Sequence, residues 1–161
     1  MQERYWKKLT DKRYRLIYIT EYYNQCIWIQ RVINVILAIT SSGAVAAWAV
    51  WKEFPVVWAG VIAVSQVITA VKPLLSYEKR IEVIHGMINQ MTLLCDEIES
   101  KWFYVANGSM TEEEINDLYY QYEKKWSDIE TNSLKGDSIP ADIRLAHIAD
   151  IKKDDYFKND F

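Results

Sequence analysis

Polar residues lie in or directly beside two long runs of the sequence that carry no ionisable residue. Ser65, Gln66 and Thr69 recur at helical spacing in the second run, Lys72 follows at the same spacing directly after it, and Asn34 and Ser41 lie in the first. Polar side chains in an apolar helix either line water or hydrogen-bond to a neighbouring helix, because they are costly to leave in hydrocarbon. We therefore take these six residues as pore-lining candidates, with helix-to-helix bonding as the alternative. Gln66 is the strongest pore-lining candidate, because it lies well inside its uncharged run and has a strongly polar side chain.

The two runs predict a transmembrane hairpin. Val32 to Trp51 contains no ionisable residue, and neither does Phe54 to Val71. At about 1.5 Å per residue, each run approaches the roughly 30 Å thickness of the hydrocarbon core. Only Lys52 and Glu53 separate them. We expect spans over 32–51 and 54–71 within a hairpin of residues 32–75; the alternative is a buried hairpin in a soluble bundle.

Basic residues beside the two runs predict the orientation. They flank the outer ends of both spans, whereas the turn between the spans holds Lys52 alone. Cytoplasmic flanks are enriched in lysine and arginine, so both termini are expected in the cytoplasm. The basic flanking residues are Lys12, Arg13, Arg15, Arg31, Lys72, Lys79 and Arg80. We expect no cleavable signal peptide, because the first apolar run follows about thirty charged and aromatic residues.

Residues 76–151 predict a cytoplasmic helical region. A heptad pattern of apolar residues continues after the second span and predicts a long amphipathic helix. We expect this helix to run antiparallel to an N-terminal cytoplasmic helix over residues 1–31 and to offer an oligomer or partner face. The residues proposed for that face are Ile81, Ile84, Ile88, Met91, Ile98 and Trp102.

Further helices are predicted beyond the long one. Asn107 and Gly108 suit the left-handed position that ends a helix, and Thr111 with Glu114 has the spacing of a capping box. A short helix is expected from about Ala141 to Ile151, followed by a mobile tail over 152–161. No strand is expected, so the fold class is all-α.

Tyrosines four residues apart mark one side of the N-terminal helix. They are Tyr14, Tyr18 and Tyr22, with Trp6 nearby. We interpret them as an aromatic packing face; a base-stacking platform is the alternative.

The sequence contains no pattern typical of an enzyme. Phosphate-binding loops, nucleophile elbows and the HExxH zinc motif are all missing. Cys26 and Cys95 lie far apart and are interpreted as small buried side chains, and His85 and His147 belong to no ligand cluster. The formal net charge of −3 gives no basic field for duplex nucleic acid. We expect no catalysis, no cofactor and no metal.

The chain resembles the SLATT family of bacterial two-transmembrane effector proteins. The matching features are the tyrosine- and arginine-bearing first helix (Arg13-Tyr14-Arg15), the back-to-back spans, the long helix from Tyr77 and the tail around Ile139-Pro140. The resemblance implies a homo-oligomer in the bacterial inner membrane that permeabilises the bilayer during antiphage defence. It also implies a trigger, either a nucleotide second messenger or a cytosolic regulatory protein, acting on the cytoplasmic helices.

Three functions are compatible with these features. The leading hypothesis is an oligomeric pore or ion-channel effector opened by a change in the cytoplasmic helices. The alternative is a non-conducting membrane anchor or scaffold that recruits a cytosolic partner through the heptad helix. A holin-like lysis protein is less favoured, because forming a hole in lipid does not require so much soluble architecture.

Overall fold

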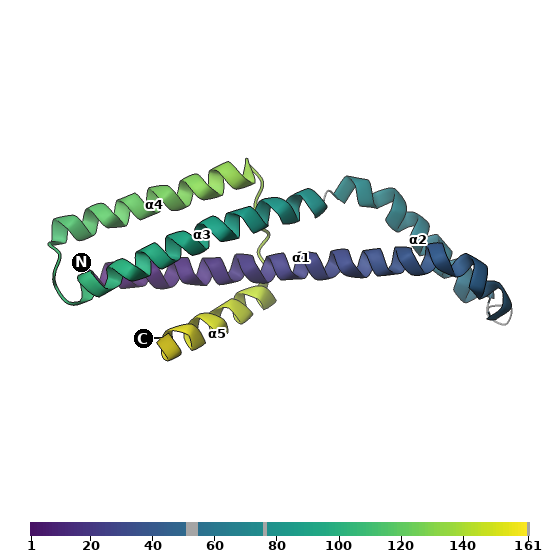
Figure 1. Ribbon diagram of the computed structural model, residues 1–161, viewed down its shortest axis with the longest axis horizontal. Helices are drawn as coiled ribbons and strands as arrows, with labels where there is room; N and C mark the ends of the chain where they lie inside the picture. Colours follow the sequence, from purple (N-terminus) through teal and green to yellow (C-terminus); the bar gives the residue numbers. More distant parts are fainter. Residues whose placement is uncertain (51–54, 76, 161) are drawn as a thin grey trace. The chain divides into compact units, whose positions relative to one another are not determined.

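The computed structural model of the 161-residue chain describes residues 1–50, 55–75 and 77–160. Side chains at 39–50, 55, 58, 72–75, 77 and 160 lie outside this description. The described residues form helices and connecting turns and include no strand, so the all-α prediction is confirmed (Figure 1). The helices are α1 (Gln2–Val50), α2 (Pro55–Leu75), α3 (Tyr77–Ala106), α4 (Glu112–Leu134) and α5 (Ile143–Asp160).

The chain divides into two compact units. The first comprises Met1–Asn24 and Glu82–Phe161, and the second comprises Gln25–Ile81. The boundaries therefore lie within α1 and α3, some residues outside the predicted hairpin limits of 32 and 75.

Helices α1 and α3 run antiparallel in the first unit, as predicted. The side chain of Gln2 donates to the carbonyl of Val105, and the ring of Tyr23 lies over that of His85, so the start of α1 faces the end of α3. Apolar side chains of both helices meet in the core, and on α3 they follow the predicted heptad spacing. The fully or almost fully buried members include Leu9, Leu16, Ile19, Ile84, Met87, Met91, Leu94 and Ile98.

Helices α4 and α5 flank this pair in the first unit (Figure 1). Ile115, Tyr122 and Trp126 of α4 are buried in the core. From α5, Leu145 and Ala149 are buried. Helix α4 therefore has one apolar face, and each flanking helix covers part of the surface that the α1–α3 pair would otherwise expose.

Local signals at the α3–α4 turn act as the sequence predicts. Helix α3 ends at Ala106, and Gly108 takes the left-handed φ of +75° that a side chain disfavours. Thr111 caps α4: its hydroxyl accepts from the Glu114 amide, and the Glu114 carboxylate accepts from the Thr111 amide at 2.8 Å. This reciprocal capping box sets where α4 begins.

The C-terminal helix is longer than predicted. The sequence predicts a helix to about Ile151 and a mobile tail after it, whereas α5 continues to Asp160. The reason is that Tyr156 and Phe157 contact α1: the Tyr156 hydroxyl bonds to Arg13, and the Phe157 ring packs edge-on against Trp6. Tertiary contacts therefore extend a helix whose own sequence is strongly charged.

The second unit consists of the later part of α1, all of α2 and the first turn of α3. Across the residues described, none of the helices has both the length and the apolar character that crossing a membrane requires. Several valines of α2 are nonetheless exposed, including Val56 at 83%, Val64 at 55% and Val67 at 63%.

Candidate functional site

The pore-lining candidates of α2 fall on different sides of the helix in the single chain. Ser65 is buried, and its hydroxyl donates to the carbonyl of Ile62 at 2.8 Å. Thr69 donates in the same way to the carbonyl of Ser65. Gln66 is exposed, because neighbouring residues of an α-helix point about 100° apart. Both hydroxyls are therefore satisfied by their own helix, whereas the Gln66 amide faces outward.

The remaining pore-lining candidates are only partly described. Asn34 is exposed on α1. Ser41 and Lys72 belong to α1 and α2, but their side chains lie outside the described residues.

The face proposed for an oligomer or a partner is largely covered within the chain. Ile84, Met91 and Ile98 are at most 2% exposed in the core of the first unit. Ile88 and Trp102 are partly buried against the same core, and Ile81 is half-buried. The buried part of the heptad face of α3 therefore belongs to the core of the first unit.

Lys12 and Arg13, which the sequence predicts as flanking charges of the first span, are buried in the first unit. Arg13 is held by Glu99 of α3, whose Oε1 accepts from both Nε and the terminal nitrogen of the guanidinium. Tyr156 of α5 bonds to both of these side chains: its hydroxyl donates to Glu99 Oε2 at 2.7 Å and accepts from Arg13 at 2.8 Å. Burial disfavours the charged guanidinium, but Glu99 outweighs it and raises the pKa of Arg13 above its ordinary value. This cluster, named here the Arg13 clamp, joins α1, α3 and α5.

A second buried cation joins α1 to α4. Lys12 lies 3.0 Å from Glu123 Oε1 and 4.5 Å from the centre of the Trp126 ring. Burial lowers the pKa of Lys12 below its ordinary value, and Glu123 only partly offsets this. Lys8 approaches the same carboxylate oxygen at 2.8 Å. The position of Lys12 and Arg13 between Leu9 and Leu16, on the apolar side of the helix, is the signal in the sequence that could have revealed their burial.

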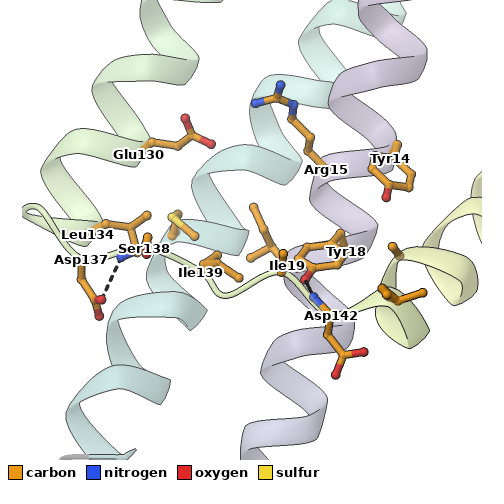
Figure 2. Close-up of a pocket in the computed structure, with 14 residues that line it drawn as sticks. Tyr14, Arg15, Tyr18, Ile19, Glu130, Leu134, Asp137, Ser138, Ile139 and Asp142 are labelled. Carbon is orange, nitrogen blue, oxygen red and sulfur yellow. Dashed lines mark hydrogen bonds between the residues drawn. The ribbon is translucent and has the colours of Figure 1, made fainter.

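A pocket of about 520 Å³ opens beside these clusters in the first unit. Tyr14, Arg15, Tyr18 and Ile19 contribute from α1, and Glu130 and Leu134 contribute from α4. Figure 2 shows Arg15 and Ile19 on the side of α1 that faces α4, and the Tyr18 hydroxyl beside Asp142 of the linker. The linker between α4 and α5, including Asp137 and Ile139, forms the third side. The volume falls within the range typical of small-molecule sites.

Tyr18 holds the linker that forms this pocket. Its hydroxyl donates to the carbonyl of Pro140 at 2.7 Å and accepts from the amide of Asp142 at 2.8 Å (Figure 2). The carboxylate of Asp142 in turn accepts from the amides of Arg144 and Leu145, where α5 begins. A ligand that displaced the linker would therefore also disturb the first turn of α5.

The pocket brings together residues from segments that are far apart in the sequence. The sequence predicts Tyr14 and Tyr18 as part of an aromatic packing face, whereas both line the pocket instead of filling the core. Trp6 and Tyr22 do pack against the core. The remaining wall comes from a polar loop whose course along α1 has no signature in the sequence.

The two cysteines are free and buried, as interpreted from the sequence. Burial raises the pKa of the Cys95 thiol to about 12, which makes it a weak nucleophile.

Comparison with protein-family models, with curated proteins and with solved structures finds no match to this chain.

Proposed function

We propose that this chain is a membrane protein of the bacterial inner membrane whose two uncharged runs insert as a hairpin and assemble, with further copies, into a pore. The pore permeabilises the membrane when the cytoplasmic first unit is triggered, as in abortive infection during antiphage defence. The proposal rests on the residues of the second unit and on the resemblance to the SLATT family.

The observation that carries the proposal is the exposed surface of α2. Val56, Val64 and Val67 leave apolar side chains uncovered, and Gln66 is exposed among them. Exposed valines suit a lipid environment or a neighbouring helix. An amide facing lipid would be unsatisfied, so Gln66 favours contact with another copy or with water. One hairpin cannot enclose water, and this is why the proposal requires an oligomer.

The continuity of α1 supports a link between trigger and pore. It is a single helix from Gln2 to Val50, so the same element carries the Arg13 clamp and part of the first uncharged run. A change in how α1 packs in the first unit would bias the arrangement of the pore between two packed states.

The test is the membrane potential of bacteria that express the full chain, followed with a potential-sensitive dye before and after phage infection. We expect infection-dependent depolarisation. Gln66→Leu should reduce it at equal membrane abundance, because leucine removes the only side-chain amide of α2. The matched control is Val64→Leu, which changes an exposed apolar side chain of the same helix and should leave depolarisation intact.

Two results would contradict the proposal. An intact potential under every condition, with the protein stably inserted, would indicate a non-conducting anchor or scaffold. Recovery of the protein entirely in the soluble fraction would reject membrane insertion, and the hairpin would then belong to a soluble bundle.

A further inference from the structure

The pocket between α1, α4 and the α4–α5 linker carries more negative than positive charge. Its acidic side chains are Glu130, Asp137 and Asp142, and Arg15 is its single basic one. Arg15 is half exposed and already pairs with Asp11 at 3.2 Å, which reduces its attraction for an anion. A phosphate-bearing ligand would meet these carboxylates at short range, where like charges repel.

The three carboxylates differ in their hydrogen-bond and ion-pair partners within the chain. Asp142 accepts from two backbone amides at the start of α5 and lies 3.2 Å from the guanidinium of Arg144, so its oxygens already have partners. Asp137 accepts from the amide of Ser138 at 2.8 Å. Glu130 has no ion-pair partner among the described residues, and Figure 2 shows its side chain pointing into the space between α4 and α1. Glu130 is therefore the carboxylate best placed to receive a cation.

The rest of the pocket is apolar and aromatic. Ile19 and Met87 form its floor from the buried core, and Leu134 adds an aliphatic side chain. The rings of Tyr14 and Tyr18 line it as well, and the negative face of an aromatic ring attracts cations. An apolar lining with few polar groups is typical of sites for small molecules.

We propose that this pocket binds a small organic cation with an apolar body, such as an aryl or alkyl amidinium or ammonium. Glu130 would pair with the cationic head, and the apolar body would contact Ile19, Leu134 and the tyrosine rings. This inference goes beyond the pore proposal and does not rest on it. It differs from what the family resemblance implies, because an anionic nucleotide would not be the ligand of this pocket.

The test is ligand-observed NMR on the full chain in uncharged maltoside micelles, with empty micelles subtracted. Benzamidinium, benzamide and benzoate serve as probes because they share one shape and differ in charge. We expect benzamidinium to bind and the other two to bind more weakly. Glu130→Gln should weaken benzamidinium about fourfold, the factor that one unit charge at ~5 Å contributes in a water-like dielectric. The matched control, Asp117→Asn, lies on α4 outside the pocket and should have no effect.

Two further variants keep the test decisive. Arg15→Gln removes a like charge and should tighten benzamidinium binding, by about twofold since Arg15 is half exposed. Ala141→Phe fills the pocket from the exposed linker and should abolish binding while circular dichroism stays unchanged.

Four outcomes would overturn the inference. They are equal binding of benzamide and benzamidinium, preferential binding of benzoate, loss of benzamidinium binding in Arg15→Gln, and no benzamidinium binding to the wild-type chain at millimolar concentration. Because the readout is binding alone, each outcome leaves the pore proposal to be judged by depolarisation.

Discussion

Replacing Glu99 by methionine removes the acceptor that holds the Arg13 clamp together. Both nitrogen contacts from Arg13 and the hydroxyl contact from Tyr156 end on this carboxylate. The side chains of Arg13 and Glu99 are only 11% and 15% exposed, so the variant would leave a nearly buried guanidinium with Asp96, at 3.5 Å, as its remaining carboxylate contact.

The expected cost follows from burial. Removing one partner of a buried ion pair typically costs about 3–5 kcal/mol, and incomplete burial places this case near the lower end, about 3 kcal/mol. Replacing both partners, with Arg13→Met and Glu99→Met together, removes the stranded charge as well as the pair. We therefore expect the double variant to cost less than the Glu99→Met variant alone, by about 2 kcal/mol.

Hydrogen exchange of the full chain in micelles measures the loss of stability at individual backbone amides, including those around the Arg13 clamp. A loss of about 3 kcal/mol corresponds to roughly a hundredfold loss of amide protection. We expect it in α5 near Tyr156 and in the facing turns of α1 and α3. Arg144→Gln is the control, since that side chain is 80% exposed and should change protection little. A double variant that costs as much as the sum of its single variants would refute the reasoning, because it would show no coupling between the two charges.

Two further predictions concern the start of α4 and the second buried cation. Thr111→Ala removes the capping hydroxyl and should lower stability by about 0.5–2 kcal/mol, measured as a loss of amide protection in the first turn of α4; unchanged protection there would contradict the cap. Burial acts to raise the pKa of Glu123, but Lys8 and Lys12 outweigh it and lower that pKa below its ordinary value of 4.5. A carboxyl with a lowered folded pKa contributes stability above its unfolded pKa, so this contribution should be lost as the pH falls below about 4.5. Glu123→Gln should weaken the fall in the free energy of unfolding as the pH is lowered below about 4.5. A pH dependence identical to that of the wild type would show that Glu123 does not contribute to this fall.

Much of the helical architecture follows from local signals. The apolar spacing of α3 predicts its buried face, and Asn107, Gly108 and Thr111 predict the turn into α4. These features were predictable because each depends on residues within a few positions of one another: a period of 3.6, a left-handed turn, a side chain that caps its own helix.

The pocket and the buried cations were not predictable in the same way. Arg13 and Glu99 are 86 residues apart in sequence, and Tyr18 is 122 residues from Pro140. A charged residue on a helix is expected to face solvent unless a partner that neutralises it is known, and the sequence therefore predicts Lys12 and Arg13 as exposed flanking charges. In the same way, the charged composition after Ile151 predicts a tail, and only the contacts of Tyr156 and Phe157 with α1 extend α5 to Asp160.

Sequence periodicity and capping residues therefore determine that this chain is helical, which faces of α1, α3 and α4 are apolar, and where α3 ends and α4 begins. Tertiary structure decides which charges are buried, that α5 continues to Asp160, and that Tyr18, Glu130 and the linker before Asp142 meet around one pocket. The physical reason is range: hydrogen bonding and side-chain spacing within a helix act over a few residues, whereas ion pairing and burial depend on residues that only folding brings together.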